Sequence, residues 1–141
     1  MQATVRWDGA VQFSATPSSG HTVIMDGSPD LGGTNAGPRP MEMMLMGLGG
    51  CTSIDVMLML QKSRQDVTDC VAELTAERAD AVPAVFTKIH VHFVVTGRDL
   101  KESHVKRAIE LSAEKYCSAS IMLAAGGVEI THSYALIEAD R

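Results

Sequence analysis

The stretch MEMMLMGLGGCTSIDVMLMLQ, residues 41–61, decides how this chain folds. It consists mainly of Met, Leu, Ile, Val and small residues, and its only charges are Glu42 and Asp55. Pro40 precedes it, at a position where proline often begins a helix. At a rise of about 1.5 Å per residue, a helix here would span roughly 30 Å. A helix that is apolar on every side either crosses a bilayer or lies buried in a soluble core.

We favour the buried core helix over the membrane span. Asp55 lies inside the stretch, the rest of the chain is rich in β-strand patterns, and three glycines interrupt the apolar run: Gly47, Gly49 and Gly50. A chain of 141 residues can hardly cover all sides of such a helix by itself. A second copy could cover the remainder, so we expect a symmetric homodimer.

Short β-like segments precede the helix. Residues 4–7 and 10–15 flank Asp8-Gly9, which predicts a hairpin with a type I′ turn, and residues 21–25 predict a third strand. Residues 26–40 are rich in Gly, Pro, Asp and Asn and read as a loop. The length of that loop suggests that it has a function or wraps around something.

After the helix, residues 67–78 and 86–96 alternate between apolar and polar, which indicates two half-buried antiparallel strands. An amphipathic helix is expected over 101–116 and a short helix over 117–125, before the last strand at 128–137. This order predicts one α+β domain over residues 1–141, with antiparallel sheets around the central helix.

Charge and cysteine content restrict the function further. The net charge is -5 and the basic residues are scattered, which argues against a nucleic-acid partner. Residues 1–7 carry no long apolar run, so we expect a cytoplasmic protein without a secretory signal. The chain has three widely spaced cysteines, an odd number, which favours reduced thiols over a disulfide framework. It has no CxxC pair, which argues against a structural zinc site. His90 and His92 share a strand face that we interpret as exposed rather than metal-binding.

Two cysteines stand at positions where a thiol could react. Cys51 follows two glycines inside the apolar helix, and Cys117 begins a predicted helix, where the helix dipole lowers a thiol pKa. A redox pair is one interpretation. The other is that both are core residues, because free cysteine is among the most buried residue types. Cys70 lies on the apolar face of its strand and is expected to be an inert core thiol.

Two motifs resemble the OsmC/Ohr superfamily of osmotically inducible and organic hydroperoxide resistance proteins. The first is Gly37-Pro38-Arg39-Pro40-Met41-Glu42-Met43 followed by Gly49-Gly50-Cys51, and the second is Cys117-Ser118-Ala119-Ser120. The order of elements also agrees. The resemblance covers nearly the whole chain and is closest to the YhfA-like branch.

The resemblance implies an OsmC-like dimer with a thiol peroxidase activity that reduces organic hydroperoxides in oxidative-stress defence. Cys51 would attack the peroxide and Cys117 would resolve the sulfenic acid as a disulfide, without a cofactor or metal. A dithiol such as lipoamide would then reduce the protein. Glu42 and Arg39 are the nearest counterparts of the family's catalytic glutamate and arginine, although Met41 stands where the family has its glutamate. Arg6, in the first hairpin, is the other candidate cation.

The alternative function is a non-catalytic protein that binds a small apolar ligand in the Met-rich surroundings of Cys51. Asp55 bears on this choice, because an unpaired carboxylate one turn from Cys51 would raise the thiol pKa unless Arg64 or another base pairs with it. Glu42 is nine residues from Cys51, about 13 Å along a helix. If Glu42 acts beside Cys51, we therefore expect it to come from the other subunit.

Overall fold

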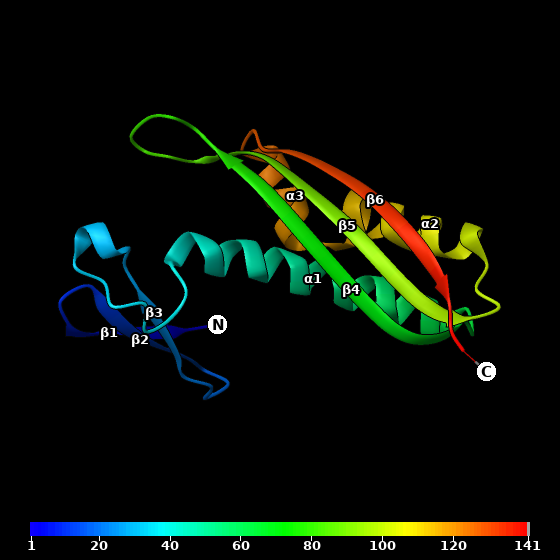
Figure 1. The fold of residues 1–141 in the computed structure, drawn as a ribbon, viewed down its shortest axis with the longest axis horizontal. Helices are drawn as coiled ribbons and strands as arrows, with labels where there is room; N and C mark the ends of the chain where they lie inside the picture. The colour runs from blue at the N-terminus through cyan, green and yellow to red at the C-terminus, as the bar shows by residue number, and fades with distance from the viewer. Residues whose placement is uncertain (141) are drawn as a thin grey trace. The chain divides into compact units, whose positions relative to one another are not determined.

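A computed structural model describes residues 1–140 of the chain (Figure 1). The chain forms two compact units, Met1–Met46 and a second that begins at Gly47. Each unit contains a three-stranded sheet, with strand order β1-β2-β3 in the first and β4-β5-β6 in the second. The observed mixture of helices and sheets confirms the α+β class.

The first unit is an antiparallel meander of β1 (Ala3–Gly9), β2 (Gln12–Pro17) and β3 (Val23–Asp26). The predicted turn at Asp8-Gly9 is wrong by about two residues. The Ser14 hydroxyl donates a hydrogen bond to the Asp8 carboxylate across the two strands, and β1 extends through Gly9. Ala10 and Val11 therefore connect the strands, with Gly9 and Ala10 at positive φ.

The long loop after β3 contains a short helix, η1 (Pro29–Leu31), and is organised by the Asp26 carboxylate. Asp26 is 2% exposed, and its Oδ2 accepts hydrogen bonds from the Thr34 backbone N–H at 2.9 Å and the Ala36 backbone N–H at 3.1 Å. These two bonds lower the pKa of Asp26, Ala36 contributing most. The hydrogen bonds of Asp26 therefore hold the loop in place, which its sequence did not predict.

We expect Asp26→Asn to loosen this loop, because a neutral amide oxygen accepts the Thr34 and Ala36 N–H groups less strongly than the charged Oδ2 does. Hydrogen exchange should show clear loss of protection at Thr34 and Ala36. The folded pKa is below 3.8. The contribution of Asp26 to stability is therefore present above pH 3.8 and is lost as pH falls through the lower folded pKa. The stabilities of the variant and the parent protein should become equal in that acidic range. Asp30→Asn, an exposed substitution in the same loop, is the control and should not change the stability.

The second unit is built on α1 (Pro40–Lys62), which starts in the first unit, and on three strands: β4 (Asp66–Arg78), β5 (Phe86–Arg98) and β6 (Glu129–Glu138). β4 and β5 pair antiparallel, as predicted. β6 pairs parallel to β5, so the expectation of purely antiparallel sheets is wrong for this strand. A parallel neighbour requires a crossover connection. Here the crossover consists of α2 (Glu102–Leu111), the π-helical turn η2 (Ser112–Tyr116) and α3 (Ser118–Ala125).

The core of the second unit lies on one face of its sheet. Every second residue of β5 points into it, namely Ile89, Val91, Phe93 and Val95. α1 contributes Leu48, Thr52, Val56 and Leu60, and α2 contributes Val105, Ala108 and Ile109. α1 approaches β4 closely at Gly49, where an added Cβ would come within 2.8 Å of the Leu74 side chain. The glycine that interrupts the apolar stretch therefore allows the helix to pack on the sheet.

Residues 1–140 leave another face of α1 exposed. Ile54 and Leu58 are 63% and 59% exposed. α1 is long and apolar enough to cross a membrane, and only part of it is buried. The core helices of soluble proteins can have the same length and composition. The one-sided burial agrees with the expectation that one chain cannot enclose this helix.

Candidate active site

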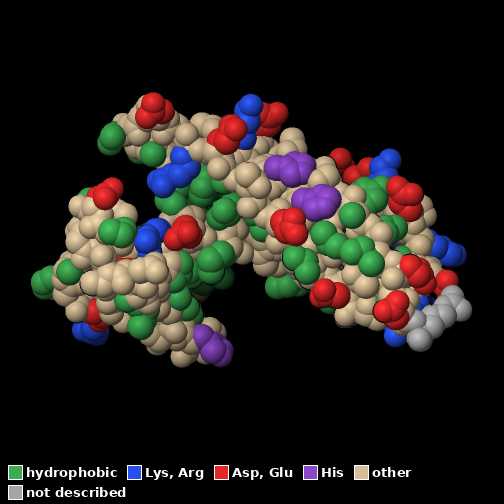
Figure 2. All heavy atoms as spheres, in the orientation of Figure 1, with side chains coloured by type: hydrophobic (Ala, Val, Ile, Leu, Met, Phe, Trp, Pro, Cys, Tyr) green, Lys and Arg blue, Asp and Glu red, His purple; other side chains and the backbone are tan. Residues whose placement is uncertain are grey.

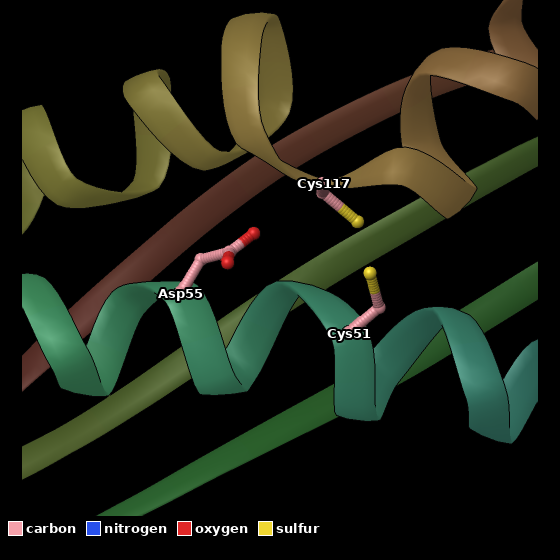
Figure 3. Close-up of side chains that lie close together, drawn as sticks. All are labelled: Cys51, Asp55 and Cys117. Atoms are coloured by element: carbon pink, nitrogen blue, oxygen red, sulfur yellow. The ribbon is translucent and has the colours of Figure 1, made fainter.

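Cys51, Asp55 and Cys117 converge in the second unit (Figure 3). A sulfur atom of each cysteine and a carboxylate oxygen of Asp55 all lie within 4.8 Å of one another. Cys51 and Asp55 project from α1, and Cys117 comes from the junction of η2 and α3, with its sulfur directed toward that of Cys51. The prediction that the two thiols lie within reach of each other is confirmed. Cys70, on β4, is outside this group.

Local helix geometry brings the three side chains together. Cys51 and Asp55 are four residues apart and share one face of α1. The segment before Cys117 winds as a π-turn, in which the Cys117 N–H donates to the Ser112 carbonyl at 2.8 Å. The expected continuous α-helix over 101–116 is therefore wrong for its last five residues, Ser112–Tyr116, which form this wider turn. Such turns are frequent at functional sites.

Cys117 is the N-cap of α3, as its position in the sequence predicted. It is 0% exposed, and its sulfur accepts a hydrogen bond from the Ser120 backbone N–H at 3.4 Å. Burial nevertheless raises the pKa of Cys117, and the nearby Cys51 adds to that rise, while Ser120 opposes it. The expected lowering of the pKa by the helix N-terminus is therefore wrong, because desolvation of the thiolate outweighs the hydrogen bonds.

Asp55 is held by hydroxyl groups. The Ser112 hydroxyl donates to Asp55 Oδ2 at 3.1 Å and accepts from the Thr52 hydroxyl at 2.9 Å, with Ser112 and Thr52 both 0% exposed. Asp55 has no ion-pair partner among residues 1–140, so the suggested pairing with Arg64 or another base is wrong. The Asp55 carboxylate lies beside two thiols and accepts a hydrogen bond from Ser112. No cation among residues 1–140 compensates its charge.

We expect Ser112→Ala to lower the free energy of unfolding by about 1–3 kcal/mol, because the buried Thr52 hydroxyl loses its partner. Chemical denaturation measures this change. Ser118 is an exposed serine at the start of α3. Ser118→Ala is the matched control and should leave the free energy of unfolding unchanged. Adding Thr52→Val to Ser112→Ala should recover part of the loss, since both partners are then removed. A neutral single variant would contradict this account of the hydroxyl pair.

The other predicted site residues, Glu42, Arg39 and Arg6, lie in the first unit. Glu42 accepts a hydrogen bond from the Arg39 backbone N–H at 2.8 Å and so caps the N-terminus of α1. The Arg39 guanidinium donates to the Asn35 side chain at 2.9 Å and to the Gly37 carbonyl at 3.1 Å. Arg6 lines the polar face of the first sheet with Asp8 and Ser14. Their predicted roles beside Cys51 remain predictions.

The histidines of β5, His90 and His92, are half-buried on the face of the second sheet that is opposite its core. Figure 2 shows neighbouring histidine side chains at the surface. His90 bonds the Thr131 and Ser133 hydroxyls at 2.6 and 2.7 Å, and His92 bonds Ser133 at 2.6 Å. Their nitrogens engage hydroxyls of β6, which agrees with the interpretation of a polar sheet face. His132, which points inward, has its pKa lowered by burial.

Two supporting residues were not identified from the sequence, Thr52 and Ser112, whereas Ser120 belongs to the second motif. Ser112 is buried like the apolar residues Val105 and Ala108 of the preceding helix. A polar residue on that apolar stripe is the signal that could have found it. Ser120 is 3% exposed, and its hydroxyl has no hydrogen-bond partner of good geometry among residues 1–140. The hydroxyl lies close enough to Cys117 to favour the charged form of the thiol.

Comparisons with known proteins identify the family of the chain. A family model described as OsmC-like protein matches residues 33–133. Protein YhfA of Escherichia coli (strain K12) is 52% identical over 139 residues, which cover 99% of this chain and 100% of that protein. A hypothetical protein from Aquifex aeolicus VF5 is 24% identical, with a TM-score of 0.86 over 99% of this chain and 97% of that one. An organic hydroperoxide resistance protein OsmC from Legionella pneumophila shares the fold at 15% identity, with a TM-score of 0.71 over 95% of each chain. By its sequence over nearly its full length and by its fold, this chain belongs to the OsmC-like family.

Proposed function

We propose that this protein is a thiol-dependent peroxidase that reduces organic hydroperoxides, with Cys51 and Cys117 as its redox pair. The observation that carries the proposal is the approach of the two sulfur atoms to within 4.8 Å. A disulfide bond is about 2.05 Å long, so closing it needs less than about 3 Å of movement. The fold shared with an organic hydroperoxide resistance protein supports the same chemistry.

The chemistry proceeds in balanced steps. The Cys51 thiolate attacks the outer oxygen of the hydroperoxide, the O–O bond breaks, and the alcohol leaves after taking a proton. Cys51 is then a sulfenic acid. The Cys117 thiolate attacks its sulfur, which forms the disulfide and releases water after protonation. An external dithiol such as lipoamide returns two electrons and two protons and restores both thiols.

The exposure of the two thiols supports this division of roles. Cys51 is half-buried, whereas Cys117 is 0% exposed, so a peroxide can reach Cys51 more readily. Burial also raises the pKa of Cys117, which keeps it protonated and less reactive toward peroxide. Thiolate character at Cys51 requires a nearby cation. We propose that Arg39 or Arg6 supplies this cation in the assembled protein.

The test is a mass-spectrometric assay. One equivalent of cumene hydroperoxide added to the reduced, metal-free protein should produce a Cys51–Cys117 disulfide and one equivalent of the alcohol. Cys70→Ser should behave like the parent protein, because Cys70 is outside the site and burial raises its pKa. If the thiols stay reduced, or Cys70 enters the disulfide, the proposal fails.

The second candidate function is the binding of a small apolar ligand, favoured by a surface pocket of about 410 Å³ that Asp55 helps to line. The other lining residues are Leu58, Met59, Lys62, Leu111 and Tyr116. Cys51, around which the sequence places the ligand, is not one of them. Calorimetry with an apolar alcohol such as cumyl alcohol tests it on the protein with Cys51→Ser. Binding without any hydroperoxide-dependent disulfide in the parent protein would favour the ligand-binding function over the peroxidase.

A further inference from the structure

The site combines features that a peroxidase alone does not require. Asp55 is directed toward two thiols by Ser112 and lacks an ion-pair partner among residues 1–140. A carboxylate in that place opposes the formation of thiolates, since like charges repel. The same three groups, once ionised, present three negative charges within 4.8 Å of one another. A cation placed between them would remove the conflict.

We propose that, in the reduced protein, Cys51, Cys117 and Asp55 bind one Zn²⁺ ion. Two thiolates and one carboxylate are ligands that zinc accepts, whereas Mg²⁺ and Ca²⁺ prefer oxygen alone. Tetrahedral zinc with Zn–S bonds of about 2.3 Å holds two sulfurs about 3.8 Å apart. The two sulfur atoms now lie within 4.8 Å of each other, so they need to approach by at most about 1 Å.

The surroundings suit a bound metal ion. Ser112 bonds one carboxylate oxygen of Asp55, which orients the ligand from behind as second hydrogen-bond partners do in metal sites. The Ser120 backbone N–H bonds the Cys117 sulfur, and the buried Ser120 hydroxyl beside it has no partner of good geometry among residues 1–140. That hydroxyl is available to donate to a metal-bound thiolate.

The binding step balances in atoms and charge. Zn²⁺ displaces two protons from Cys51 and Cys117, which pass to solvent, and the Asp55 carboxylate binds without losing one. Water takes the fourth position. The consequence of zinc binding for regulation rests on the proposed function. A thiolate that shares a lone pair with zinc is a weaker nucleophile, so zinc should slow the reaction of Cys51 with a hydroperoxide. Oxidation to the disulfide removes both thiolates and should release the metal.

Cobalt provides a probe with a spectroscopic signature. Co²⁺ added to the reduced, metal-free protein should produce a near-ultraviolet thiolate-to-cobalt absorption band that saturates at one ion per chain, and Zn²⁺ should abolish it. Cys51→Ser and Cys117→Ser should each lose at least half of the band. Cys70→Ser should keep it fully. Asp55→Asn should weaken Co²⁺ binding at least about tenfold, as removal of one of three ligands implies. A missing band, or an equal loss in Cys70→Ser, would overturn the proposal.

A measurement on the unmodified protein guards against variants that misfold. Zn²⁺ should slow alkylation of Cys51 at least about tenfold while leaving Cys70, which is also half-buried, unchanged. Equal rates at Cys51 with and without zinc would contradict the site. The metal assays and the hydroperoxide assay are independent. A cobalt band without a peroxide-driven disulfide refutes only the peroxidase, and a disulfide without the band refutes only the metal site.

Discussion

Cys51→Ser should abolish hydroperoxide reduction, with a loss of about three orders of magnitude or more in rate. The thiolate is the nucleophile, and a serine hydroxyl at neutral pH is neither ionised nor reactive toward an O–O bond. Cys51 is the more exposed of the two paired thiols. The buried Cys117 is therefore not expected to replace it in the first step. A coupled assay with a dithiol reductant measures the turnover.

Two further variants separate the roles of the thiols. Cys117→Ser should still reduce the first equivalent of hydroperoxide, but it should stop at a sulfenic acid on Cys51, which dimedone traps. Cys70→Ser should turn over like the parent protein. If Cys117→Ser, instead of Cys51→Ser, eliminates the first reduction, the roles are reversed. The half-buried position of Cys51 would then need another explanation.

The sequence predicted most elements because their patterns are local. The alternation in β4 and β5 fixed their inward faces correctly, and the apolar stretch became α1 almost to the residue. The direction of β6 was not predictable in the same way. Its pattern is compatible with either direction, and only the path of the crossover through α2 and α3 makes it parallel to β5.

The candidate site was only partly predictable for a related reason. Cys51 and Cys117 were found through motifs, but their environment depends on contacts between segments about 60 residues apart. The pair Thr52 and Ser112 shows this directly, since their hydrogen bond joins α1 to η2. The pKa of Cys117 shows it too, because its local position at a helix start lowers the pKa while burial by the fold raises it.

The second large effect concerns the uncovered face of α1. Ile54 and Leu58 are one turn apart, on the same side of the helix, and are more than half exposed. We propose that a second copy of the chain covers them. Burying one such side chain contributes about 1.5–3 kcal/mol to the free energy of dimerisation. In a twofold dimer each residue is buried twice, once from each subunit. Ile54→Asp therefore removes about 3 kcal/mol or more of apolar burial and adds two carboxylates that are costly to desolvate.

Light scattering at micromolar concentration should accordingly give twice 15.1 kDa for the parent protein. Ile54→Asp should give a mass near 15.1 kDa and unfold at a lower temperature, since a loss of about 3 kcal/mol or more raises a dissociation constant by about 10²-fold or more. Val71→Asp is the matched control, because Val71 is also exposed and apolar but lies on β4, on the open face of the sheet. It should leave the dimer intact. A parent protein that is monomeric, or a control that dissociates as readily, would mean that something other than a second copy covers α1.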